Sequence, residues 1–233
     1  MANIIFAGTP EFSVPSLMAL TEIGFNPSLV ITQPDRRAGR GKKIKKSPVK
    51  IAAEKLQIPI SQPVSINESE YLEYLNQLDI EIIVVAAYGM IFSEELLAIP
   101  KLGCINIHAS LLPKWRGAAP IQRAIMNGDK KIGVSIMKIE EKLDSGPVLT
   151  SKEIELDQNA IHGDIEKKLS KVGADLLIKN LKNFKEGNLK FINQIHSEAT
   201  YAKKIDKNET KINWNLDASK VLAHIHGLSP SPG

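Results

Sequence analysis

Short runs of apolar, mostly β-branched residues alternate with amphipathic stretches along most of the chain. The apolar runs predict strands at 3–8, 27–32, 58–62, 80–89, 103–109, 131–139 and 146–156. Apolar residues at helical spacing predict helices at 49–56, 68–78, 93–99, 119–128 and 164–184, and a further helix that is entered after Pro15. Because strands and helices alternate, we expect an α/β fold: a Rossmann-like, mainly parallel sheet with helices on both faces.

The regular pattern weakens after residue 190. The sequence there is polar and predicts one short helix, at 217–225, before it ends on Ser-Pro-Ser-Pro-Gly. We therefore divide the chain into a domain at 1–190 and a region at 191–233, which we interpret as a linker to a truncated C-terminal domain.

The composition is that of an ordinary soluble globular protein, with 43% apolar and 24% charged residues among 233. No apolar run approaches the roughly 18 residues of a membrane span, and the N-terminus lacks the basic start and the cleavage site of a signal peptide. The single cysteine, Cys104, can form neither an internal disulfide nor a cysteine zinc cluster. We expect a cytoplasmic protein.

Positive charge is concentrated at residues 34–50, which we call the basic segment. It holds eight lysines and arginines against one aspartate, a net charge of +7, so the rest of the chain carries −3 of the overall +4. Charge runs are usually solvated loops, but Gly39 and Gly41 would also allow the close backbone approach that phosphate contact requires. The sequence therefore predicts one basic loop on an otherwise slightly acidic domain.

Two hydrogen-bonding side chains interrupt the apolar run at 103–109, where a strand is about to end. Alternate side chains of a strand share a face, so Asn106 and His108 would point one way, and Ile105 and Ile107 the other. Ligands of open α/β sheets bind outside the carboxyl ends of strands, which makes this face a candidate site. Asn106 could instead hold a loop, and His108 could bond to a backbone carbonyl; the pattern alone leaves both interpretations open.

A catalytic imidazole needs a partner that fixes its tautomer and stabilises its charged form, and a carboxylate does this best. The candidates are Glu140, Glu141 and Asp144, in the turn between the last two predicted strands. Asp144 precedes Ser-Gly-Pro, so it could equally be the aspartate of an Asx-turn.

The chemistry that such a set would support is acyl transfer, because an amide and an imidazolium together stabilise an oxyanion. The sequence has no G-x-S-x-G motif, and no histidine or acidic cluster has metal-ligand spacing. We expect direct transfer of an acyl group from a donor to an amine, with no metal.

Five stretches resemble the folate-dependent formyltransferases, and within them the branch that acts on aminoacylated tRNA. In chain order they are FAGTPEFSVPSL, QPDRRAGRGKKIKKSPVK, VVAAYGMI, NIHASLLPKWRGAAPIQRAI and LDSGPVL. The resemblance covers essentially the whole chain. It implies transfer of a formyl group from 10-formyltetrahydrofolate to the α-amine of methionine on initiator tRNA, by a monomer. It also implies a formyltransferase catalytic domain at 1–190, and a linker with the incomplete start of a β-barrel tRNA-binding domain at 191–233.

The same resemblance assigns roles to residues. Asn106 and His108 would stabilise the tetrahedral oxyanion, while Asp144 pairs with His108 and helps to remove the proton from the attacking amine. The folate pocket would be lined by Tyr88, Gly89, Met90, Ile91, Ser110, Leu111, Leu112, Pro113, Glu140, Glu141 and Lys142. The aminoacyl end and the tRNA acceptor stem, which the basic segment enters in this branch, would contact Gly8, Thr9, Phe12, Arg36, Arg40, Lys42 and Lys43.

Three other functions remain as alternatives. The first is a sugar-nucleotide formyltransferase, with the same chemistry but without the need for a basic segment. The second is an RNA-binding module in which the α/β core is only a scaffold. The third is a dinucleotide oxidoreductase, which is disfavoured because the first strand ends with a single glycine, Gly8, in place of a G-x-G-x-x-G motif.

Overall fold

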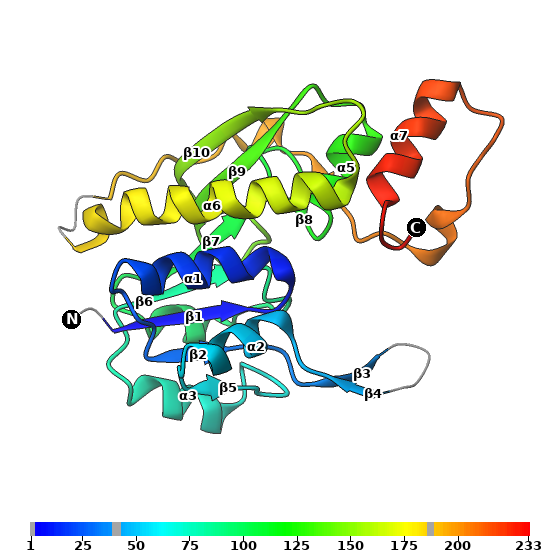
Figure 1. The fold of residues 1–233 in the computed structure, drawn as a ribbon. Coiled ribbons are helices and arrows are strands. Elements are labelled where there is room, and N and C mark those ends of the chain that lie inside the picture. The colour runs from blue at the N-terminus through cyan, green and yellow to red at the C-terminus, as the bar shows by residue number, and fades with distance from the viewer. Residues whose placement is uncertain (1–2, 39–42, 186–188) are drawn as a thin grey trace.

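The structure, a computed structural model, describes residues 3–38, 43–185 and 189–233. Within them, seven strands form one sheet in the order β10-β9-β7-β6-β1-β2-β5 (Figure 1). These strands are β1 (Ile4–Gly8), β2 (Leu29–Ile31), β5 (Ile60–Ser61), β6 (Ile82–Ala86), β7 (Cys104–His108), β9 (Lys131–Lys138) and β10 (Val148–Glu155). Those from β7 to β5 are parallel, and β9 and β10 extend the sheet in antiparallel fashion. The predicted mainly parallel sheet is confirmed.

Helices cover both faces of the sheet, as its apolar, fully buried central strands β1 and β6 require. Along β1, Ile4 and Phe6 belong to one core cluster, and Ile5 and Ala7 belong to the other. The first cluster lies under α1 (Val14–Glu22), α2 (Pro48–Lys55), α5 (Pro120–Met126) and α6 (His162–Lys185). The second lies under α3 (Ser69–Asn76) and α4 (Glu94–Ala98). A 3₁₀ turn at Glu11–Ser13 leads into α1, which therefore begins slightly before Pro15.

The long helix α6 crosses close over β7 and β9 because it carries a glycine at the crossing point. A Cβ atom on Gly173 would lie only 2.8 Å from Cγ2 of Ile107 and 3.4 Å from Cγ1 of Val134. The helix was predicted at 164–184 and begins two residues earlier, at His162. Figure 1 shows α6 lying beside α1, with its first turn near α5.

The basic segment, which the sequence predicted to be a loop, contains two short strands. Arg36–Ala38 and Lys43–Lys45 form the antiparallel strands β3 and β4. The hairpin protrudes from the body of the molecule on the side toward which β1 points (Figure 1). Its tip, with Arg40 and Lys42, lies outside the described residues.

The chain after α6 turns back and packs against β8 and α5. Strand β11 (Tyr201–Ala202) pairs in parallel with β8 (Arg116–Gly117), in the chain that follows β7. Two 3₁₀ turns, at His196–Glu198 and Lys207–Thr210, were not predicted. Helix α7 (Ala218–Leu228), predicted at 217–225, packs on α5. The assignment of 191–233 to a linker and a partial second domain stays a prediction.

None of the helices in the described part of the chain combines the length and the apolar character that crossing a membrane would require.

Candidate active site

A pocket of about 600 Å³ opens at the carboxyl ends of the central parallel strands. Its wall is built from the turns after β1, β6 and β7, from the loop between β9 and β10, and from the first turns of α5 and α6. Asn106, His108 and Asp144 all line it. Open α/β sheets bind their ligands at this edge, and the volume is that of an ordinary small-molecule site.

Strand β7 alternates between two environments, as its sequence predicts. Ile105 and Ile107 lie in the core beneath α6, whereas Cys104 belongs to the core on the other face. Asn106 and His108 share the face of Cys104 and reach the pocket. Asn106 is half-buried, and its amide has no hydrogen-bond partner in the described structure. Its N–H groups are therefore free to donate to a ligand.

His108 is held by two different groups, one at each ring nitrogen. Its Nε2 lies 2.9 Å from the carbonyl oxygen of Trp115, and its Nδ1 lies 3.6 Å from Oδ2 of Asp144. A carbonyl only accepts hydrogen bonds, so Nε2 carries a proton. In the neutral ring, Nδ1 would then present a lone pair toward a carboxylate. The imidazole is therefore oriented from both sides, by a backbone carbonyl at Nε2 and by a carboxylate at Nδ1.

Asp144 is the acidic residue that the structure brings to His108. Glu140 and Glu141 are exposed at the pocket rim, whereas the Asp144 side chain is 13% exposed. Its Oδ2 also accepts a hydrogen bond from the backbone N–H of Gly117, at 2.8 Å. The carboxylate thus bonds across the pocket rather than within its own turn, which excludes the Asx-turn interpretation. The residue has φ of +48°, a conformation that is rare outside glycine.

The site does not offer an activated nucleophile of its own. Burial raises the pKa of the Cys104 thiol to about 12. The Ser110 hydroxyl donates to the carbonyl oxygen of Lys114 and is fully buried. A reacting nucleophile is therefore expected to come from a substrate. Within the described residues, no group of three or more His, Cys, Asp and Glu side chains is arranged to hold a metal ion.

The residues expected at folate fall into two groups. Tyr88, Gly89, Met90, Ile91, Glu140 and Glu141 line the pocket; Ser110, Leu111, Leu112, Pro113 and Lys142 do not. The loop at 110–113 is held from behind by Ser135, whose Oγ accepts from the N–H of Leu112 and donates to the carbonyl oxygen of Ser110. Leu111 faces a separate, smaller pocket. The assignment of this loop and of Lys142 to folate stays a prediction.

The residues expected at the aminoacyl end are also divided. Phe12 lines the pocket, whereas Gly8 and Thr9 support it from outside. The Thr9 hydroxyl donates to the carbonyl oxygen of Tyr88 at 3.0 Å, which ties the turn after β1 to the end of β6. Arg36, at the base of the hairpin, donates to Gln33, whose amide in turn reaches the same Tyr88 carbonyl. Lys43 belongs to β4.

One wall of the pocket was not foreseen from the sequence. It is formed by the first turns of α5 and α6, through Gln122, His162 and Glu166. Burial lowers the pKa of His162, and the charge of Glu166 partly offsets this. Helical periodicity predicted both helices, but it carries no signal for which helix end meets the carboxyl edge of the sheet.

Comparison with known proteins identifies the class to which this site belongs. Residues 2–181 match a family model described as formyl transferase. The chain belongs to the formyl transferase family. Among its relatives, the methionyl-tRNA formyltransferase of Pelagibacter ubique is 48% identical over 233 residues, which cover 99% of this chain and 75% of that protein. The methionyl-tRNA formyltransferase of Thermotoga maritima is 44% identical over 231 residues, with coverage of 99% and 74%.

Solved structures share the fold at lower identity. An N-formyltransferase from Helicobacter canadensis, in complex with folinic acid and dTDP-3-aminofucose, has a TM-score of 0.76 at 21% identity, covering 97% of this chain and 80% of that one. HypX from Aquifex aeolicus, in complex with tetrahydrofolic acid, has a TM-score of 0.70 at 17% identity, covering 99% and 35%. At these identities the likeness shows the fold alone.

Proposed function

We propose that this protein transfers a formyl group from 10-formyltetrahydrofolate to the α-amino group of methionine on initiator tRNA, the step that prepares this tRNA for translation initiation. The observation that carries the proposal is the meeting of Asn106, His108 and Asp144 in one pocket at the carboxyl edge of the sheet. Membership of the formyl transferase family supports the reaction, and relatives named methionyl-tRNA formyltransferase support the acceptor. Folate compounds in the complexes of two structural neighbours support the donor class.

The reaction begins when the neutral amine of the acceptor attacks the formyl carbon. A new C–N bond forms, and the carbonyl electron pair moves to oxygen to give a tetrahedral oxyanion. We propose that the amide N–H of Asn106 and the imidazolium of His108, which line the pocket together, donate to this oxygen. Both groups are held by a strand, so little reorganisation accompanies the appearance of the charge.

The second half of the reaction moves one proton. The attacking nitrogen becomes an ammonium and loses its proton to the Asp144 carboxylate, which lies beside the His108 ring. The C–N10 bond of the folate then breaks, the oxyanion reverts to a carbonyl, and N10 takes up a proton. The products are the N-formyl ester and tetrahydrofolate, and the enzyme returns to its starting protonation state.

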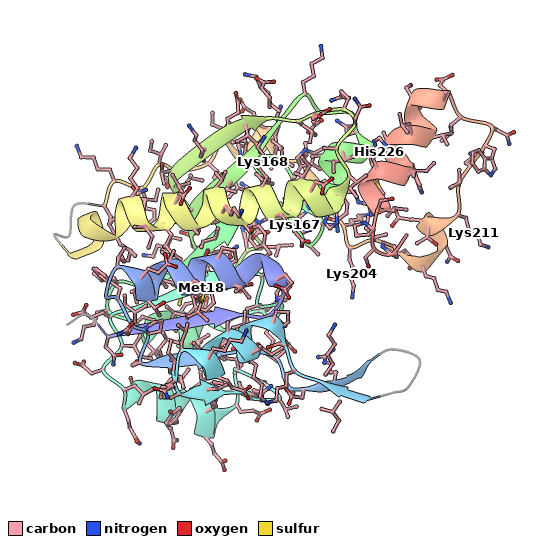
Figure 2. The ribbon with its side chains drawn as sticks, viewed as in Figure 1. Met18, Lys167, Lys168, Lys204, Lys211 and His226 are labelled. Carbon is pink, nitrogen blue, oxygen red and sulfur yellow. The ribbon has the colours of Figure 1, made fainter. Side chains whose placement is uncertain are left out.

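We assign the basic segment to the acceptor stem of the tRNA. The β3–β4 hairpin protrudes on the side toward which β1 points, as do the segment around Lys204 and Lys211 and the helix α7 (Figures 1 and 2). Lysines and arginines on this side would contact phosphates around the mouth of the pocket. A small acceptor such as an amino sugar has no need of a +7 segment.

Two further parts of the proposal concern assembly and compartment. We propose that the chain acts as a monomer, because both faces of its sheet are already covered by its own helices. We also propose that it acts in the cytoplasm, where charged tRNA and folate donors meet. Light scattering after size-exclusion chromatography tests the first point, since a stable dimer would double the mass.

The direct test is a formylation assay with 10-formyltetrahydrofolate and charged initiator tRNA. We expect formyl-methionine on the tRNA, and no formylation of dTDP-amino sugars at comparable enzyme concentration. The second candidate, a sugar-nucleotide formyltransferase, is favoured by its structural neighbour in complex with dTDP-3-aminofucose. Formylation of the sugar with no product on tRNA would replace our proposal with that candidate.

The remaining candidate is an RNA-binding module without catalysis. His108→Ala separates it from the proposal, because the substitution should abolish formylation while tRNA binding remains. If the unsubstituted chain binds tRNA but never formylates it with saturating folate donor, the binding module is the better account.

A further inference from the structure

The loop that presents Asp144 is held by a side chain from far along the sequence. Gln194 lies in the segment after α6 and is 9% exposed. Its Nε2 donates to the carbonyl oxygen of Asp144 at 2.9 Å and to that of Gly146 at 2.6 Å. One glutamine therefore forms hydrogen bonds to the backbone on both sides of Ser145.

The oxygen of the same amide bonds to Arg116, in the chain that follows β7. Its Oε1 accepts from Nε and Nη2 of Arg116, at 3.1 and 2.7 Å, and Arg116 is only 3% exposed. The next residue is Gly117, whose N–H donates to Oδ2 of Asp144. Gln194 thus joins the two backbone segments between which the carboxylate is held.

The orientation of this amide follows from its partners. Two carbonyl oxygens require the NH₂ group on one side, and a guanidinium requires the oxygen on the other, so a flipped amide would lose all four contacts. Asparagine would be too short to span the same distance. A glutamate would keep the oxygen toward Arg116 but would lose both donors toward Asp144 and Gly146.

The Asp144 loop needs such support. Its residues at 140–143 are exposed, and Asp144 itself has positive φ, which is unfavourable for a residue with a side chain. In the described structure, Gln194 is the group that donates to the Asp144 carbonyl oxygen. Without it, a partly buried carbonyl would lack a partner, and the loop could relax toward solvent.

We propose that Gln194 is a positioning residue for catalysis: it fixes the Asp144 carboxylate against Gly117 and His108. This inference rests on the proposed formyl transfer. It places a functional residue outside 2–181, the part of the chain that matches the family model. The segment after α6 would then be part of the frame of the active site, rather than only a connection.

The test begins with Gln194→Met, which keeps the length of the side chain and removes its donors and its acceptor. We expect kcat to fall about 10- to 100-fold, because a displacement near 1 Å at a reacting group has an effect of this size. The KM for the folate donor should change by less than about 2-fold. An unchanged kcat, or a loss that is entirely in the KM for folate, would overturn the inference.

Gln194→Glu separates the two ends of the amide. Because it retains an acceptor for Arg116 and lacks the donors for the loop, we expect it to be as defective in kcat as Gln194→Met. Recovery to the unsubstituted kcat would mean that pairing with Arg116 is what matters, and would overturn the role in placing Asp144.

A double-mutant cycle with Asp144→Asn tests whether Gln194 acts through Asp144. In the Asp144→Asn background, Gln194→Met should reduce kcat by less than about 2-fold further. Losses that multiply would show an independent, purely structural role. The matched control is Gln158→Met, because Gln158 also donates to two backbone carbonyls, those of Asp129 and Leu156, away from the pocket. Its kcat should stay unchanged.

A measurement that needs no catalysis keeps this inference separate from the proposed function. The Gly117 amide is protected by its bond to Asp144, so its hydrogen exchange, followed by NMR, should speed up at least about 10-fold in Gln194→Met. If the unsubstituted chain formylates neither charged tRNA nor a dTDP-amino sugar, the proposed function fails, whatever the exchange rate of the Gly117 amide is. If formylation is normal and Gly117 exchange is unaltered by the substitution, only the role of Gln194 fails.

Discussion

The pocket and the basic segment are both charged regions, but they are built in opposite ways. Around the pocket, His108 is 5% exposed and each of its ring nitrogens faces a defined partner. In the basic segment, eight positive charges fall within residues 34–50, whose described strands β3 and β4 protrude from the body of the molecule. There, Lys46 and Lys50 pair with Glu54 and Asp35, while the side chain of Lys45 has neither a hydrogen bond nor an ion pair within the described residues.

This difference follows from what each region must recognise. An oxyanion that forms for an instant is stabilised only by donors that are already aimed at it, so the catalytic groups have to be buried and fixed. A nucleic acid presents many phosphates, and its attraction acts over about 10 Å at moderate salt, so loosely placed cations suffice. Substitutions should therefore change kcat at the pocket, and KM with its salt dependence at the hairpin.

The largest effect is expected from His108→Ala. The change removes both the oxyanion donor and the group that pairs with Asp144, and we expect kcat to fall about 10³-fold or more. The salt dependence of KM for charged tRNA should stay as it was. Steady-state formylation at several salt concentrations measures both. A variant that retains a tenth of the activity would contradict the assignment of His108 to catalysis.

Asn106→Ala should give the next largest effect. It removes one amide donor toward the oxyanion and leaves the His108–Asp144 pair in place, so we expect kcat to fall about 10²- to 10³-fold. The control is Asn127→Ala, because the Asn127 amide bonds to Asp129 on the surface. If both variants lost activity equally, the loss at Asn106 would reflect folding rather than oxyanion stabilisation.

At the hairpin, replacement of Arg40, Lys42 and Lys43 by alanine should raise KM for charged tRNA about 10-fold at moderate salt and leave kcat nearly unchanged. If each residue contacts one phosphate of the duplex stem, the slope of log KM against log salt should fall by about 3. The control is Lys46→Ala, since Lys46 is already paired with Glu54 and should contribute less. Identical kinetics across the salt series would remove the hairpin from tRNA binding.

The same contrast explains what the sequence could predict. The sheet, its helices and the shared face of Asn106 and His108 follow from local periodicity, and the structure confirms them. The partner of His108 did not follow from local pattern, because Glu140 and Glu141 satisfy the same chemical requirement as Asp144. The resemblance favoured Asp144, and the conformation of the loop brings it to the ring.

Local sequence patterns did not predict the residues that support the site and line its further wall. Gln194 lies 50 residues from Asp144, in a polar stretch whose composition resembles a linker. The Trp115 carbonyl that fixes Nε2 of His108 is a backbone group, which any residue would supply. His162 comes to the pocket because α6 lies over β7, β9 and β10 and its first turn reaches the pocket wall, and periodicity along a helix does not report where that helix ends in space.

An ion pair outside both of these regions gives the smallest predicted effect. Arg123, on α5, makes two short bonds to Glu209 of the C-terminal segment, at 2.6 and 2.9 Å, but the Glu209 side chain is 38% exposed. The guanidinium donors lower the pKa of Glu209 from 4.5 to about 2. A carboxylate with a lowered folded pKa adds stability above pH 4.5, and this contribution is lost as pH falls from 4.5 toward 2.

Glu209→Gln isolates that charge, because the amide oxygen can still accept from the N–H of Asp206. We expect the free energy of unfolding at pH 7 to fall by about 1 kcal/mol or less, since solvent screens an exposed pair. The gap between variant and unsubstituted chain should narrow as pH drops below 4.5, in urea titrations at each pH. Glu198→Gln is the control, as Glu198 has no ion pair within the described residues. A gap that stays constant down to pH 3 would mean that side-chain shape, rather than charge, docks the C-terminal segment on α5.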